Sequence, residues 1–162
     1  MLSWVPGLGA PVRVILLDRQ IQHLEDRGEL DQARAVRSSA LKEVPAKLTG
    51  PLWRSEGFDR LERRYDYPEA LKAFTKAMDV LDQSSFLLGI TGPERVWYGA
   101  EVSALKTGDL PRARELYTKL RDSLNAMPWW VKGGEGWRRY LDSADWLERN
   151  IPKEPGRASE PR

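Results

Sequence analysis

The chain has 162 residues, of which 41% are hydrophobic and 31% are charged, a composition typical of a single soluble globular domain. Its 26 basic and 24 acidic side chains leave a net charge of only +2, so it lacks the strong positive field that draws nucleic acids or anionic membranes. Cysteine is absent and His23 is the only histidine. Disulfides, thiolate metal sites, and zinc or iron sites built from several histidines of one chain are therefore excluded.

The first residues do not resemble a targeting segment. They carry Pro6, Gly7, Gly9 and Pro11, and they have neither a positively charged start nor a continuous apolar core, so we predict no signal peptide. The apolar run Val12–Leu17 is too short to span a bilayer. We therefore expect a cytoplasmic protein.

Glycine and proline divide the rest of the chain into segments with helical periodicity, and none shows the period-two alternation of a strand. The predicted fold class is therefore all-α. The clearest helix is Pro68–Leu81, whose apolar residues recur at steps of three and four along one stripe. In chain order, we predict helices over residues 11–27, 31–44, 52–64, 68–81, 94–107, 111–124 and 137–150. The proline-rich, polar segment 152–162 is expected to be disordered.

The first six helices follow a pattern of helix, tight turn, helix, repeated three times. We expect one domain over residues 1–151, with antiparallel hairpins at about 11–45, 52–82 and 94–125 and a capping helix at 137–150. The three turns have matching sequences, RGELDQARAV, YDYPEALKAF and TGDLPRARELY. Their aligned alanines, Ala33, Ala70 and Ala113, are separated by 37 and 43 residues. Such a period is typical of stacked helical hairpins.

These motifs resemble the tetratricopeptide repeat family, in which a tight turn is followed by a small alanine and then by an aromatic residue. Trp97, eleven residues before Gly108, matches the family's tryptophan position in the third unit. The chain departs from the pattern at Arg37 in an aromatic place, at Tyr65 in place of a turn glycine, and at Arg54 in a tryptophan place. The resemblance covers about residues 14–125. Its spacings exceed the family's period of about 34 residues, which implies longer helices or inserted loops at 46–51 and 83–93. An unrelated helical bundle is the alternative fold.

The resemblance implies a short superhelix that binds a protein or peptide on the concave face formed by the first helix of each hairpin. By position, this face would include Asp18, Gln22, Glu25, Ser55, Asp59, Glu62, Tyr98, Val102 and Leu105. The lysine and asparagine with which one subgroup of the family grips C-terminal carboxylates are missing from these places. The face is acidic at one end and apolar at the other, which favours a mixed or basic helical ligand.

The sequence contains no motif for chemistry. No phosphate-binding loop, dinucleotide-binding motif or nucleophile elbow occurs. His23 lies inside the first predicted helix and is interpreted as structural. The acidic cluster Glu25, Asp26, Glu29 and Asp31 surrounds a helix start, where carboxylates interact favourably with the helix dipole. We therefore predict no catalytic residue, no metal, no cofactor and no enzyme activity.

Two other classes of function remain as alternatives. Basic residues cluster at 60–64 and 112–121, and seven tryptophans could stack on the bases of a single strand. These basic residues alternate with acidic ones, which is typical of a solvated helix surface. A nucleic-acid-associated or regulatory helical protein is the first alternative. A cofactor-free enzyme, whose groups meet only in three dimensions, is the second.

The tryptophans near the C-terminus suggest a second surface. In the predicted capping helix, the apolar stripe Trp137, Tyr140, Leu141, Ala144 and Leu147 should seal the third hairpin. Trp146 falls on the opposite side of that helix. We expect Trp146, together with Trp129 or Trp130, to mark a surface for a partner or for self-association, either as a homo-oligomer or as a subunit of a larger complex. The alternative is that neighbouring segments fold over Trp146.

Overall fold

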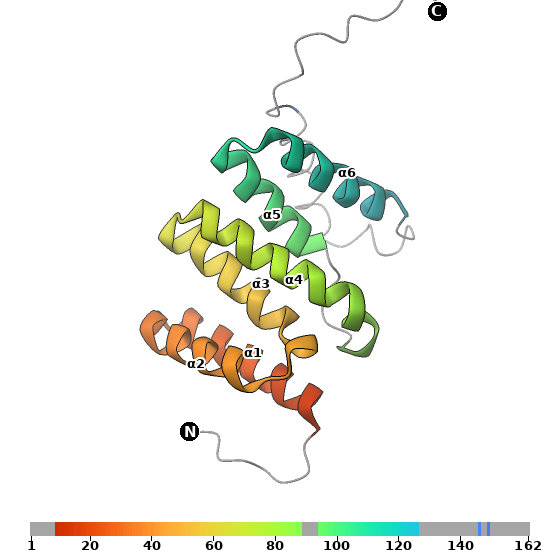
Figure 1. Ribbon diagram of the computed structural model, residues 1–162. Helices are drawn as coiled ribbons and strands as arrows, with labels where there is room; N and C mark the ends of the chain where they lie inside the picture. The colour runs from red at the N-terminus through yellow and green to blue at the C-terminus, as the bar shows by residue number, and fades with distance from the viewer. Residues whose placement is uncertain (1–8, 89–93, 127–145, 147–148, 150–162) are drawn as a thin grey trace, which may run out of the picture.

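The computed structural model describes residues 9–88, 94–126, 146 and 149. All regular structure within these residues is helical, which confirms the predicted all-α class for this part of the chain. Figure 1 shows the arrangement. The helices are α1 Ala10–Asp26, α2 Leu30–Glu43, α3 Gly50–Phe58, α4 Tyr67–Leu88, α5 Glu94–Thr107 and α6 Leu110–Ala126, with a short 3-10 helix at Ala46–Leu48 and a π-helical segment at Asp59–Arg64.

The observed helices follow the predicted ranges closely, with one extension and one insertion. Helix α4 continues beyond the predicted end at Leu81 to Leu88, because no glycine or proline interrupts the chain before Gly89. The 3-10 helix Ala46–Leu48 fills the segment between α2 and α3. The two segments in which the sequence implied longer helices or inserted loops therefore differ. The first contains the 3-10 helix, and the second contains the extension of α4.

Helices adjacent in sequence pack against each other. Short turns join α1 to α2, the π-helical end of α3 to α4, and α5 to α6, and the helices of each pair are in contact. Helix α3 also packs on α1 and α2, and α4 packs on α5. Figure 1 shows the three pairs piled in chain order from the red N-terminal end to the blue-green C-terminal end. Each pair therefore buries apolar surface against the next pair as well as within itself.

The three turns aligned by sequence adopt the same backbone conformation. Gly28, Tyr65 and Gly108 have φ values of 77°, 54° and 80°, in the left-handed region that suits glycine and is unfavourable for tyrosine. The buried alanine five residues later donates its N–H to the backbone oxygen of the residue after the left-handed one, at 2.9–3.0 Å in all three turns. The matching sequences thus correspond to matching local structures.

The π-helical segment adds one residue to the second turn. In the first and third turns, the N–H of Glu29 and of Asp109 reaches an oxygen five residues back, whereas the N–H of Asp66 reaches Arg60, six residues back. A π-helix closes wider backbone rings than an α-helix and so accommodates an extra residue. This segment contributes Asp59 and Arg63 to the polar contacts described below.

The core between the second and third pairs is centred on Phe74 of α4, which is fully buried. Its ring lies between Gly57 of α3 and Gly99 of α5, where an added Cβ would come within 2.6 Å and 2.3 Å of the ring. Phe58 meets the ring edge-on, with centroids 5.0 Å apart. Both glycines are therefore required for three helices to approach one aromatic side chain. Trp97 is half-buried and packs against this core and against the apolar cluster of α6.

Two further properties bear on function. Among the described residues, no helix combines the length and apolar character needed to cross a membrane. Within the same residues, no group of three or more histidine, aspartate or glutamate side chains is arranged to hold a metal ion.

Candidate functional site

A pocket of about 310 Å³ opens between α1, α3 with its π-helical end, and α5. These are the first helices of the three pairs, so the pocket lies on the face for which the sequence predicted ligand contacts. Its lining is mostly charged or polar. The lining residues are Asp18, Gln22, Glu25, Asp26, Arg54, Ser55, Phe58, Glu62, Arg63 and Arg95.

The innermost carboxylate of the pocket is that of Asp18, which is 6% exposed. Its Oδ2 accepts hydrogen bonds from Arg54 Nη2 at 3.1 Å and from Gln22 Nε2 at 3.2 Å. Its Oδ1 is shielded from solvent and has no hydrogen-bond partner among the residues that the structure describes. Burial raises the pKa of Asp18, because the loss of hydration outweighs the attraction of the Arg54 guanidinium. The pocket therefore contains one unused acceptor.

Arg54 stands where the tetratricopeptide pattern has tryptophan, and it is 6% exposed. A buried guanidinium needs a carboxylate, because desolvating an unpaired charge costs several kcal/mol. Asp18 of α1 supplies that carboxylate. An ion pair thus joins α1 to α3 at the base of the pocket, at a position where the family pattern would place an indole ring.

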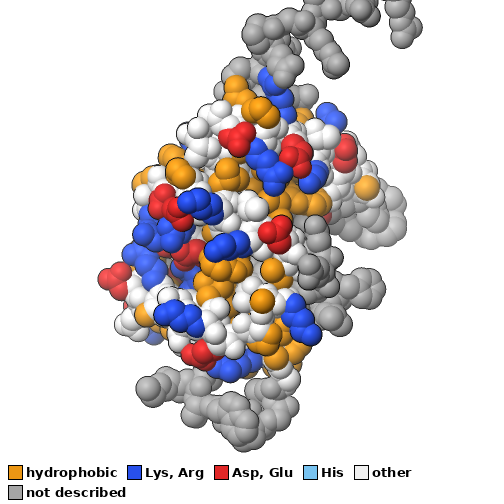
Figure 2. All heavy atoms as spheres, in the orientation of Figure 1, with side chains coloured by type: hydrophobic (Ala, Val, Ile, Leu, Met, Phe, Trp, Pro, Cys, Tyr) orange, Lys and Arg blue, Asp and Glu red, His pale blue; other side chains and the backbone are white. Residues whose placement is uncertain are grey.

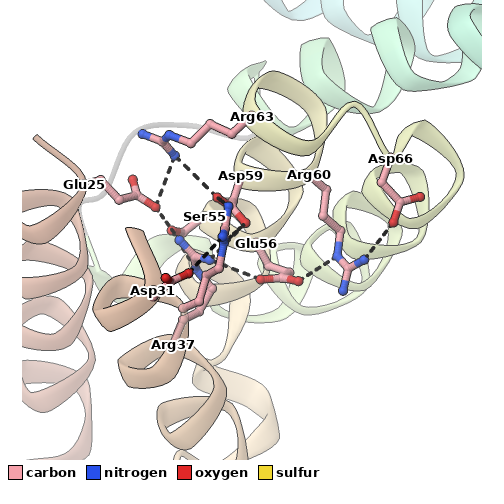
Figure 3. Close-up of polar contacts among 10 residues, drawn as sticks. Glu25, Asp31, Arg37, Ser55, Glu56, Asp59, Arg60, Arg63 and Asp66 are labelled. Atoms are coloured by element: carbon pink, nitrogen blue, oxygen red, sulfur yellow. Dashed lines mark hydrogen bonds and ion pairs between the residues drawn. The ribbon is translucent and has the colours of Figure 1, made fainter. Parts of the chain in front are cut away.

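A network of ion pairs adjoins the pocket and is centred on Arg37 of α2 (Figure 3). Arg37 is fully buried. Its Nε donates to Ser55 Oγ at 3.1 Å, its Nη1 to Glu56 Oε2 at 3.2 Å, and its Nη2 to Glu25 Oε1. Arg63 also lies 3.3 Å from Glu25 Oε1. Burial raises the pKa of Glu25 in spite of these two arginines.

The network extends along α3 through two more arginines. Arg34 of α2 donates from Nε and Nη2 to the carboxylate of Asp59, at 3.0 and 3.2 Å. Arg60 bridges Glu56 at 2.6 Å and Asp66 at 3.1 Å, which fixes the turn into α4. Figure 3 shows Arg60 reaching from Glu56 to Asp66, on one side of the group formed by Glu25, Asp59 and Arg63. The ion pairs of the network hold the first pair of helices against the second and thereby set the shape of the pocket.

The predicted concave face is only partly reproduced. Five of its nine residues, Asp18, Gln22, Glu25, Ser55 and Glu62, line the pocket. Asp59 does not. It is 1% exposed and its carboxylate is held by Arg34, so it is not open to a partner. Helical spacing placed it beside Ser55 and Glu62, but spacing within α3 says nothing about the arginines that α2 extends over it.

The three predicted residues of α5 lie elsewhere. Tyr98, Val102 and Leu105 are half-buried and pack against the apolar cluster of α6. They belong to the contact between α5 and α6 rather than to the pocket. Helix α5 contributes Arg95 instead, whose guanidinium carbon lies 5.3 Å from the centroid of the Phe58 ring.

The predicted tryptophan surface falls mostly outside the described residues. This applies to Trp129, Trp130 and most of the predicted capping helix 137–150. Trp146 is described and is 54% exposed.

Sequence reasoning missed five residues of the pocket lining, namely Asp26, Arg54, Phe58, Arg63 and Arg95. Arg54 carried a usable signal, since an arginine at a position that should be buried predicts a buried carboxylate nearby. Arg95 had none, because the approach of α5 to α1 is a tertiary feature. Glu101 of α5 was also missed. It is fully buried, and within the described part of the chain neither of its carboxylate oxygens has a hydrogen-bond partner. Burial raises its pKa to about 8.

Charge on the visible face of the molecule shows no patch of one sign. Figure 2 shows acidic and basic side chains interleaved with apolar ones. The basic residues of α6 follow the same rule, since Arg112 and Lys119 both pair with Glu115. In comparisons with known proteins, no family model, no curated protein and no solved structure matches this chain.

Proposed function

We propose that the chain is a protein-interaction module of tetratricopeptide-like architecture that binds a peptide or helix of another protein in the pocket between α1, α3 and α5. The observation that carries the proposal is the pocket itself, because the first helix of each of three consecutive pairs contributes to it. The function consists of binding alone, without catalysis or a cofactor. A cytoplasmic adaptor, or a subunit of a larger assembly, fits this role.

Two structural features support the tetratricopeptide-like part of the proposal. The three turns share a left-handed residue five positions before a buried alanine, and the second pair buries an aromatic residue, Phe74, four positions after that alanine. Small residues that allow close helix approach, followed by a large residue that fills the space to the next pair, are what stacked hairpins require. A peptide bound across the first helices would contact all three pairs.

Selection of peptides from a display library on the full chain tests the proposal. Gln22 is an exposed residue that lines the pocket, so Gln22→Trp should fill the pocket while leaving the core intact. Arg19→Trp is the matched control, because Arg19 is exposed on the same helix and does not line the pocket. We expect Gln22→Trp to weaken selected peptides by about tenfold or more and Arg19→Trp by less than about twofold. Equal binding by wild type and Gln22→Trp would place the site elsewhere.

Trp146 is proposed as part of a second contact surface, together with Trp129 or Trp130, for self-association or for a larger complex. The supporting observation is that its large apolar side chain is 54% exposed, and exposed tryptophans are preferred anchors of protein interfaces. Trp146→Ala should weaken assembly by about 1–2 kcal/mol or more with little change in the free energy of unfolding. Analytical ultracentrifugation over a concentration series measures this effect. A variant that loses stability and keeps its assembly state would show that Trp146 is part of the core.

A further inference from the structure

We infer that the pocket between α1, α3 and α5 is a subsite for one positively charged side chain, a lysine or an arginine, of the bound peptide. The inference rests on the proposed function and names the chemistry of the partner. Three observations on the described residues carry it. One carboxylate oxygen of the pocket is buried and accepts no hydrogen bond, two carboxylates of the lining are unpaired, and the arginines of the lining already contact other side chains.

The unused acceptor is Oδ1 of Asp18. This oxygen is shielded from solvent and accepts no hydrogen bond, while the other oxygen of the same carboxylate accepts two. A buried carboxylate oxygen without a donor is unfavourable, because it has lost its hydration and gained no hydrogen bond in return. A ligand that brings an N–H group to this oxygen removes that penalty, whereas an apolar ligand would leave it in place.

The two unpaired carboxylates are those of Asp26 and Glu62. Both residues line the pocket and are exposed, and neither forms an ion pair or a hydrogen bond with the described residues. They come from different elements, α1 and the π-helical segment. A cation in the pocket would therefore meet carboxylates from two sides.

Two of the three arginines of the pocket are paired with carboxylates of its lining. Arg54 is bound to Asp18, and Arg63 lies 3.3 Å from Glu25. Arg95 lies over the ring of Phe58 and keeps its charge. Four carboxylates and three guanidinium groups line the pocket, so the net charge that a ligand meets is negative. An anionic ligand would be repelled by Asp26 and Glu62 and could reach Arg54 or Arg63 only by displacing their carboxylates, whereas a cation would displace no existing partner.

The size of the pocket fits a side chain better than a larger ligand. Its volume of about 310 Å³ is at the lower limit of sites that enclose small molecules. A single long side chain can enter while its backbone stays on the surface. The raised pKa values of Asp18 and Glu25 agree with this picture, because a bound cation would offset the burial of these carboxylates.

The test uses the peptides selected on the full chain. We expect them to share one lysine or arginine, and its replacement by norleucine or citrulline, which keep the length and remove the charge, should weaken binding by about tenfold or more. On the protein side, the double variant Asp26→Asn with Glu62→Gln should weaken the same peptides by about tenfold. Both residues are exposed, so the fold should persist. Asp79→Asn, an exposed carboxylate of α4 outside the pocket, is the control and should change binding by less than about twofold.

The outcomes separate this inference from the proposed function. Peptides that are lost in Gln22→Trp but tolerate norleucine or citrulline would overturn the inference and leave the function standing. Peptides with a shared acidic residue, weakened by Arg95→Gln, would do the same and would show that the pocket prefers anions. A library that yields no peptide sensitive to Gln22→Trp would contradict both.

Discussion

The two junctions between helix pairs have different kinds of side chain at their centres. The first pair is held to the second by a buried ionic network centred on Arg37, beside an apolar cluster that Leu52 of α3 shares with α1 and α2. The second pair is held to the third by apolar packing centred on Phe74, which lies between Gly57 and Gly99. Arg37 and Phe74 occupy the same place in the sequence repeat, four residues after the aligned alanine, and both are fully buried.

The same repeat position can therefore hold a charged side chain or an apolar one, provided that the residues packed around it differ accordingly. A buried guanidinium requires acceptors on every side, and Glu25, Ser55 and Glu56 provide them. A buried phenyl ring requires space and no polar partners, and two glycines provide that space. The ionic junction positions the carboxylates Glu25 and Asp18 of the pocket, whereas the apolar junction contributes the ring of Phe58 and, over it, Arg95.

The largest expected effect is at the ionic junction. Arg37→Ala should lower the free energy of unfolding by about 3–5 kcal/mol, because it removes a fully buried guanidinium and leaves the partly buried carboxylates of Glu25 and Glu56 with one arginine each, Arg63 and Arg60. Urea denaturation measures the change. The control is Arg13→Ala, whose ion pair with Glu43 is exposed on both sides and should contribute less than about 1 kcal/mol. Similar losses in the two variants would remove the distinction between a buried network and surface pairs.

The next effect concerns Glu101, a buried carboxylate that has no arginine to pair with among the described residues. Burial raises its pKa from 4.5 to about 8, so the folded chain holds a proton that the unfolded chain releases. The free energy of unfolding should therefore fall as the pH rises between these values, with a slope of up to about 1.4 kcal/mol per pH unit. Below about pH 4.5 the proton is bound in both states and the slope from this residue vanishes.

The variant Glu101→Gln isolates this contribution. It should be less sensitive to pH, and its stability relative to wild type should increase by about 2–4 kcal/mol between about pH 5 and about pH 8. Denaturant titrations of both proteins at a series of pH values give the difference. Parallel stability curves for the two proteins would show that Glu101 is ionised, and therefore partnered, in solution.

A smaller effect is expected from crowding the apolar junction. Gly99→Ala would place a Cβ 2.3 Å from the Phe74 ring, and overpacking of this kind destabilises by about 1–3 kcal/mol. Combining it with Phe74→Leu should cost less than the sum of the two single changes, because the smaller side chain makes room for the methyl group. A double-mutant cycle from thermal or urea unfolding measures the coupling. Strict additivity would mean that Gly99 and Phe74 do not share this space.

The smallest effect is at the second turn, where Tyr65 has a φ of 54° and is exposed. A non-glycine residue in this conformation is strained by about 1–2 kcal/mol. Tyr65→Gly should relieve part of that strain and stabilise the chain by up to about 1 kcal/mol, since Gly28 and Gly108 already serve the equivalent turns. A rise in the melting temperature is the expected readout. A clear decrease would indicate that the tyrosine ring makes a stabilising contact that outweighs the strain.

Much of the fold was predictable because it depends on local signals. Proline, glycine and apolar spacing located six helices, and the three matching sequences located the turns within the pairs. The candidate site was less predictable, because it depends on contacts between elements distant in sequence. Periodicity put Gln22 and Glu62 on one face, and both line the pocket, but it could not show that Arg34 covers Asp59 or that Tyr98 and Val102 of α5 pack towards α6. The arginines at aromatic and tryptophan positions were the one sequence signal of the ionic junction.

If the pocket between α1, α3 and α5 receives the peptide, binding should perturb the backbone amides around it. A titration of the isotopically labelled full chain with a selected peptide, followed by amide chemical shifts, measures this. We expect the largest shifts at pocket residues of all three helices, such as Gln22, Ser55 and Arg95. Shifts confined to α2, α4 and α6, for example around Lys72 and Glu115, with the pocket residues unchanged, would contradict this expectation.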